Sequence, residues 1–204
     1  MAAARVAVGA ILLVAEAAWW AALVRDPSQV RVHGVPLEIC DTNVLVTCVA
    51  LWWRARWPAE VSWFWAFAGG IPSLLTPSPA AAFPDWLYFQ YFVVHGGLVV
   101  AASFLAIGLG LSPGRGAVAR VLGVTAAYAA AMAVVDWATG LNVMYLRGYP
   151  PGPPTLLNVL GPWPWYLASV AVITLLLFVL LDAPFRPARR RARDAVRGPR
   201  ASRV

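Results

Sequence analysis

The sequence predicts an all-α fold, a polytopic membrane helix bundle with six transmembrane helices and both termini cytoplasmic. Of the 204 residues, 61% are hydrophobic and only 12% are charged, whereas soluble domains carry about a quarter charged residues. The mean hydropathy is +0.69, and the apolar residues form long stretches without the alternation of an outer-membrane barrel. This composition excludes a disordered chain, a soluble nucleic-acid-binding protein and a disulfide-stabilised secreted module.

Six stretches approach the length of about twenty mostly apolar residues that a spanning helix needs. They cover residues 4–24, 36–53, 60–75, 86–111, 118–138 and 164–181. The third is the weakest, because Gly69, Gly70 and Pro72 interrupt its far end. The first is longer than the apolar core of a signal peptide and contains a glutamate, so we expect an uncleaved N-terminal helix. The expected organisation is a six-helix domain over residues 1–183 and a disordered basic tail over 184–204.

The distribution of arginine predicts the orientation. All sixteen basic residues are Arg, and eight of them lie in the last nineteen positions. With six spans, the side that holds both termini takes thirteen arginines, and the other side takes three (Arg25, Arg31 and Arg147). Because cytoplasmic loops are enriched in arginine, we expect a multi-pass cell-membrane protein. The tail is expected to bind anionic inner-leaflet lipids, with no nucleic-acid partner because it lacks stacking aromatic residues.

Ionisable residues inside apolar spans are costly, and each is therefore a candidate for function. With a helical rise of 1.5 Å per residue, Cys40 lies about 6 Å, His95 about 13 Å, Glu16 about 12 Å and Asp136 about 3 Å below the outer end of its helix. Asp41 follows Cys40 directly, and because adjacent helix positions differ by about 100°, we do not expect both side chains to enter the same narrow cleft. All of them fall in the outer half of the bilayer, which predicts a polar cavity at the depth of the lipid ester carbonyls.

A cysteine close to a histidine can lose its proton and become a nucleophile. Glu16, Asp41 or Asp136 would then orient the imidazole of His95. The alternative is that Cys40 is a packing residue and His95 an interhelical hydrogen-bond donor.

The remaining polar residues of interest are neutral groups and possible metal ligands. Asn142 and Tyr145 follow the fifth span as neutral polar groups. Cys48 lies about 12 Å along the same helix from Cys40, which is too far for a disulfide bond. No metal or cofactor is expected, because the two histidines and two cysteines lack the spacing of a ligand set.

Three segments together resemble the YwaF-type family of bacterial six-helix integral membrane proteins. They are Pro36–Asp41, Gly70–Pro77 followed by His95, and Asn142–Tyr145 leading to Leu160–Tyr166. That family is similar to a eukaryotic transmembrane protein proposed to be a cysteine-dependent phospholipid acyltransferase. The resemblance implies that Cys40 and His95 are the catalytic pair. Family members often carry an Asn-Tyr pair after the fifth span; here Val143 follows Asn142, so the role of that tyrosine is absent or passes to Tyr145.

Two functions follow as hypotheses. The first is a lipid acyltransferase acting on membrane phospholipids near the outer leaflet, with Cys40 as nucleophile and His95 as base. The second is a non-enzymatic lipid-binding or membrane-assembly protein whose polar cluster is structural. A carrier is disfavoured, because the chain has no internal repeat.

Overall fold

The computed structural model describes residues 1–25, 35–150 and 154–197, and within them the backbone forms helices and no strands. Arg31, which entered the orientation argument, lies outside the described residues. The longer elements are α1 (Ala2–Arg25), α3 (Ile39–Trp53), α4 (Arg56–Trp65), α6 (Trp86–Ser103), α7 (Ala117–Thr139), α8 (Trp165–Asp182) and α9 (Arg186–Arg197). Shorter helical turns are η1 (Ala66–Gly70), α5 (Ile71–Leu75), η2 (Phe104–Gly108), η3 (Val143–Tyr145), η4 (Leu156–Val159) and η5 (Ala183–Phe185).

Four helices are long and apolar enough to cross a membrane. They cover Ala2–Arg25, Trp86–Gly108, Ala117–Thr139 and Trp165–Arg191. The second predicted stretch forms the fifteen-residue helix α3, and the third is divided into α4, the π-helical turn η1 and α5. The backbone keeps right-handed helical angles at Ala66, Gly70 and Ile71, so the glycine pair lies at the end of a π-helical turn and does not stop the helix. The chain is thus an all-helical protein with four candidate spans by length, and the count of six remains a prediction.

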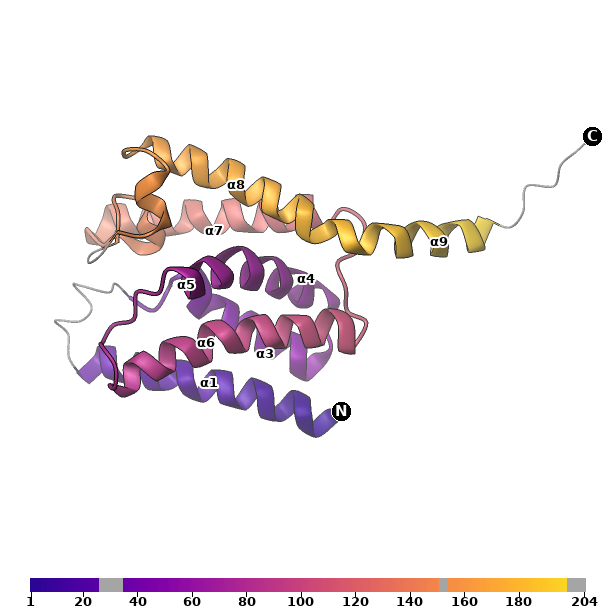
Figure 1. The fold of residues 1–204 in the computed structure, drawn as a ribbon, viewed down its shortest axis with the longest axis horizontal. Coiled ribbons are helices and arrows are strands. Elements are labelled where there is room, and N and C mark those ends of the chain that lie inside the picture. The colour runs from indigo at the N-terminus through magenta and orange to yellow at the C-terminus, as the bar shows by residue number, and fades with distance from the viewer. Residues whose placement is uncertain (26–34, 151–153, 198–204) are drawn as a thin grey trace, which may run out of the picture.

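The helices form two groups that pack side by side (Figure 1). Helices α1, α3, α4 and α6 contact one another in the first group, and α7 and α8 lie against its α4 side. Phe64 of α4 packs on Phe178 of α8 with ring centroids 4.7 Å apart. The Trp65 indole N–H donates to Thr125 Oγ1 of α7 at 2.8 Å. Paired polar groups of this kind are what helix contacts in a bilayer require, because lipid offers no hydrogen bonds.

The bundle has two chemically different ends. The N-terminus and the start of α9 lie at the same end (Figure 1), which we call the basic end; it also holds Arg54, Arg56 and the loop of residues 109–116. The end of α1, the starts of α3 and α6, and the segment of residues 140–164 lie at the opposite end, which we call the cavity end.

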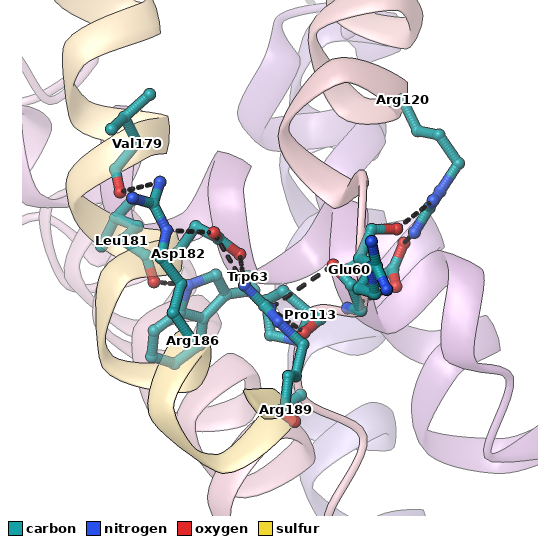
Figure 2. A network of polar contacts seen from close by, with 12 residues as sticks. Glu60, Trp63, Pro113, Arg120, Val179, Leu181, Asp182, Arg186 and Arg189 are labelled. Atoms are coloured by element: carbon teal, nitrogen blue, oxygen red, sulfur yellow. Dashed lines mark hydrogen bonds and ion pairs between the residues drawn. The ribbon is translucent and has the colours of Figure 1, made fainter. Parts of the chain in front are cut away.

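The tail differs from the expected disorder. Helix α9 continues from α8 and η5 over Arg186–Arg197, and residues 198–204 lie outside the described part of the chain. Asp182 anchors the helix: its carboxylate accepts bonds from Arg186 Nε at 2.9 Å and from Arg189 Nη2 at 2.8 Å (Figure 2). Arginine and alanine also favour helix strongly. The composition predicted a disordered basic tail. The two contacts with Asp182 instead fix the first residues of a helix.

Candidate functional site

A cavity of about 380 Å³ opens at the cavity end. Side chains from α1, α3, α6 and the η1–α5 segment line it together with the loops around Tyr145 and Leu156. Among its lining residues are five that the sequence singled out: Glu16, Cys40, Asp41, His95 and Tyr145. Of the four depths compared, those of Glu16, Cys40 and His95 belong to cavity-lining residues, and their chemical roles stay predictions. Asp41 lines the same cavity as Cys40, so the expectation that the two side chains point apart was wrong.

The glycine pair of η1 packs closely against the two helices that carry Cys40 and His95. A Cβ atom added to Gly69 would lie 3.9 Å from Cys40 Sγ, and one added to Gly70 would lie 3.5 Å from the His95 carbonyl oxygen. The turn η1 packs against both α3 and α6. The sequence showed these glycines only as an interruption of a span; in the fold Gly69 lies beside the Cys40 thiol and Gly70 lies against the backbone of α6.

The geometry of His95 determines its tautomer. Its Nδ1 lies 2.8 Å from the Tyr91 carbonyl oxygen. A carbonyl can only accept, so Nδ1 carries the proton and the lone pair of the neutral ring is on Nε2. The Tyr91 ring packs on the imidazole at 4.1 Å, and the Tyr91 hydroxyl donates to Ser73 O at 2.9 Å. A backbone carbonyl thus orients His95, and the prediction that a carboxylate of Glu16, Asp41 or Asp136 does so was wrong.

Three carboxyl groups line the cavity, those of Glu16, Glu38 and Asp41. Glu16 Oε1 accepts from the Trp20 indole at 2.6 Å, and Asp41 Oδ2 accepts from the Glu38 backbone N–H at 3.0 Å. Both oxygens of Glu38 lie 3.1 Å from the Met144 backbone nitrogen. Within the described residues no arginine forms an ion pair with any of the three. Among the described residues, the cavity lining therefore holds three carboxyl groups and no arginine.

Glu38 is a site residue that sequence reasoning missed. It precedes α3, and burial raises its pKa to about 7, opposed by the hydrogen bond from Met144. The available signal was the Glu-x-x-Asp spacing at the start of an apolar helix, which is typical of a reciprocal helix cap. Here that spacing joins the cap of α3 to a loop more than a hundred residues later in the sequence.

Tyr145 reaches the cavity from an unusual backbone. Met144 and Tyr145 both have positive φ angles, 55° and 57°, and the Tyr145 carbonyl accepts a hydrogen bond from the Tyr166 hydroxyl. The phenol of Tyr145 interacts electrostatically with Glu38 and Cys40. Burial, and next the nearby Glu38 carboxylate, raise the pKa of Tyr145. The hydroxyl therefore stays protonated and can donate a hydrogen bond inside the cavity.

Asp136 and Asn142 do not line the cavity. Asp136 Oδ1 accepts from the Val143 N–H at 2.7 Å. The Asn142 side chain donates to Gly148 O at 3.0 Å and accepts from the Arg147 N–H at 2.8 Å. Both side chains hold the turn that carries Tyr145, so their contact with the site is indirect.

The two cysteines are free thiols in different surroundings. Cys48 is buried and donates to the Gly9 carbonyl at 3.3 Å, which is the contact of a packing residue. Cys40 lines the cavity. Among the described residues, no three His, Cys, Asp or Glu side chains are placed to hold a metal ion.

Comparison with known proteins identifies the family. Residues 1–182 match the TMEM164 family, so the chain belongs to this family of transmembrane proteins. No curated protein and no solved structure matches the sequence. The membrane assignment agrees with the four apolar helices, while the YwaF-type resemblance remains a prediction.

Proposed function

We propose that this member of the TMEM164 family is a membrane-embedded acyltransferase that moves an acyl chain between phospholipids through a thioester on Cys40. The observation that carries the proposal is that Cys40, His95 and Tyr145, from three separate segments, line one cavity. They supply the three parts that acyl transfer needs, namely a nucleophile, a base and a hydrogen-bond donor for the developing oxyanion. The apolar lining residues Val94, Leu156 and Leu157 suit a lipid chain.

The chemistry needs only the groups present. Cys40 Sγ attacks the ester carbonyl carbon while His95 Nε2 takes the thiol proton. The ester C–O bond breaks, the leaving lysophospholipid oxygen takes that proton, and an acyl thioester remains on Cys40. The hydroxyl of a second lysophospholipid then attacks the thioester carbonyl carbon while His95 Nε2 takes the hydroxyl proton. The C–S bond breaks, and His95 passes that proton to the departing sulfur. The Tyr145 hydroxyl donates to the carbonyl oxygen in both steps.

The same proposal includes an orientation. With the basic end at the cytoplasmic face, both termini are cytoplasmic and the cavity opens in the outer half of the cell membrane. The arginines at the basic end support this placement, because arginine accumulates on the cytoplasmic side. The exposed Arg190 and Arg191 of α9 would then face the anionic inner leaflet.

One observation favours a second candidate, a lipid-binding protein without enzymatic activity. Burial of Cys40, and after it the nearby carboxyl groups of Asp41, Glu38 and Glu16, disfavours a negative thiolate. In that case the cavity binds a lipid and the thiol has no chemical role. The two candidates differ in the reactivity of Cys40.

A thiol-reactivity measurement separates them. The purified protein in nanodiscs is treated with an electrophilic acyl-mimicking reagent, and the labelled cysteine is identified by mass spectrometry. We expect fast labelling of the wild type, loss of labelling in Cys40→Ser, and a sharp decrease in rate in His95→Ala. Cys48→Ser is the matched control and should label like the wild type. Slow labelling that is insensitive to His95→Ala would reject the acyltransferase.

The activity itself is measured with a phospholipid that carries a labelled acyl chain and an unlabelled lysophospholipid acceptor. Transfer should require both Cys40 and His95, and a thioester-linked chain should be released from the protein by neutral hydroxylamine. Transfer that persists in Cys40→Ser would exclude the thioester route.

A further inference from the structure

The turn that carries Tyr145 has an unusual backbone. Met144 and Tyr145 follow one another with φ angles of 55° and 57°, both in the left-handed region. Residues other than glycine rarely adopt this conformation, and it persists only where surrounding contacts hold it. The placement of Tyr145 at the cavity therefore depends on the groups that bond this turn.

Two carboxyl groups bond consecutive N–H groups of the turn. Asp136 Oδ1, near the end of α7, accepts from the Val143 N–H at 2.7 Å. Both carboxylate oxygens of Glu38, which precedes α3, lie 3.1 Å from the Met144 nitrogen. Asp136 belongs to the helix that leads directly into the turn, so its bond is local. The bond to Glu38 instead connects the turn to the segment that carries Cys40.

The α3 side of this connection is held by other contacts. The Tyr128 hydroxyl of α7 donates to the Leu37 carbonyl at 2.7 Å and lies 2.6 Å from Thr42 Oγ1. The Glu38 N–H donates to Asp41 Oδ2 at 3.0 Å. Glu38 therefore projects from a backbone that is bonded on both sides, and a residue that positions another group requires such support.

We propose that Glu38 is a positioning residue, which holds the Tyr145 side chain at the cavity beside the Cys40 thiol by bonding the Met144 N–H. This role rests on the proposed function, in which Tyr145 is the hydrogen-bond donor. The phenol of Tyr145 interacts electrostatically with both Glu38 and Cys40, in agreement with this proximity. Cys40 lies two residues after Glu38. One short segment thus carries the nucleophile and, through one backbone contact, positions the donor for the oxyanion.

The alternative is that Glu38 only caps α3. Glu38 and Asp41 do form a reciprocal cap at the start of that helix. A cap stabilises its helix, but its loss has no reason to depend on Tyr145. Asp85 provides the comparison, because it caps α6 at the same end of the bundle. Its Oδ1 accepts from the Leu87 N–H at 2.8 Å, and it does not line the cavity.

A double-mutant cycle tests the proposal. Acyl transfer in nanodiscs is measured for the wild type, Glu38→Ala, Tyr145→Phe and the double variant. We expect Glu38→Ala to lower kcat by about tenfold, since misplacing a reacting group by about 1 Å costs up to a hundredfold. In the Tyr145→Phe background the same substitution should have little further effect, because the two residues act as one unit. Losses that multiply in the double variant would overturn the proposal.

Two conservative variants separate the reach of the side chain from its charge. Glu38→Gln keeps an oxygen at the same length and should transfer nearly as fast as the wild type. Glu38→Asp keeps the charge and is a good helix cap, but it is one methylene shorter and should lose activity like Glu38→Ala. It also replaces Glu38→Ala should that variant fold poorly. Full activity of Glu38→Asp would contradict the positioning role.

Asp85→Ala is the matched control. It removes an acidic cap without touching the turn, so the melting temperature should decrease and kcat should stay unchanged. A loss of kcat equal to that of Glu38→Ala would show that removing any cap at this end is sufficient, and would overturn the specific role of Glu38.

Hydrogen exchange distinguishes this inference from the proposed function. Exchange of a peptide covering residues 141–148 is followed by mass spectrometry in the wild type and in Glu38→Asp. We expect the Met144 amide to exchange about tenfold faster in the variant, because a hydrogen bond to a charged acceptor protects at that level. Faster exchange in a protein that transfers no acyl chain would reject the enzyme and support the contact that positions Tyr145. Unchanged exchange would overturn the positioning role even where transfer is observed.

Discussion

The two ends of the bundle treat buried acidic groups in opposite ways. At the basic end, Glu60 and Asp182 are tied to arginines and to backbone groups of the 109–116 loop (Figure 2). At the cavity end, Glu16, Glu38 and Asp41 meet indole and backbone N–H groups and, among the described residues, no arginine.

The difference separates structure from function. A carboxylate whose charge is neutralised within the chain stabilises the fold and has little left to offer a ligand. A carboxylate without a cation makes the fold less stable, and such strain is expected at binding sites. Substitutions at the basic end should therefore change stability and leave the cavity chemistry intact, and substitutions at the cavity end should do the reverse.

The largest expected effect is that of Tyr145→Phe at the cavity end. Removing one oxyanion donor costs about a hundredfold in rate, while the midpoint of thermal unfolding should change little because phenylalanine keeps the aromatic ring. The measurement is acyl transfer in nanodiscs beside a melting curve. Tyr149→Phe is the control: its hydroxyl donates to Gly161 O at 2.6 Å outside the cavity. Equal rate losses in both variants would contradict the assignment.

At the basic end, Glu60→Ala should reduce the free energy of unfolding by about 2–3 kcal/mol. The substitution leaves the buried Gly114 N–H without its acceptor at 2.9 Å and Arg120 without its ion pair. Thermal unfolding in detergent reports the loss, and Glu60→Gln should recover part of it by keeping the acceptor. The labelling rate of Cys40 should not change, and a parallel decrease would show that the two ends are coupled.

The next effect concerns space beside the thiol. Gly69→Ala places a methyl group in ordinary contact with Ile39 and Cys40 Sγ, at 3.8 and 3.9 Å. Stability should be kept or slightly raised, because alanine favours helix by up to about 1 kcal/mol over glycine. Labelling of Cys40 should slow by about tenfold, since misplacing a reacting group by about 1 Å has effects up to a hundredfold. Gly123→Ala, which meets open space on α7, should label at the wild-type rate.

The smallest effect distinguishes two neighbouring arginines of α9. Arg189 donates to Asp182 and, at 2.6 Å, to Pro113 O, and its side chain is 20% exposed. Arg189→Ala should destabilise the protein by about 1 kcal/mol, and the exposed Arg190→Ala by less than about 0.5 kcal/mol. The melting temperature of each variant is measured. Equal decreases in the two variants would mean that Asp182 does not anchor α9.

Several residues that line the cavity could be selected from the sequence alone. The cost of a charged or polar group in lipid marks Glu16, Cys40, Asp41 and His95 as unusual wherever they occur. Counting along the helices placed them in the same predicted half of the bilayer, because the helical rise is constant. The same reasoning included Asp136, which falls in that half but lies outside the cavity lining. The sequence allowed a prediction of how far along its helix each residue lies. It did not allow a prediction of the direction in which the side chain faces.

By itself, the sequence determined the all-helical membrane class, the approximate bounds of the long helices, and the end of the bundle at which the polar residues gather. These follow from composition and helical periodicity, which are local properties. Only the tertiary structure decided that the Tyr91 carbonyl orients His95, that Glu38 joins the start of α3 to Met144, and that arginines neutralise Glu60 and Asp182. Each of these depends on rotation about a helix axis or on a contact between distant segments, and helix packing alone determines both.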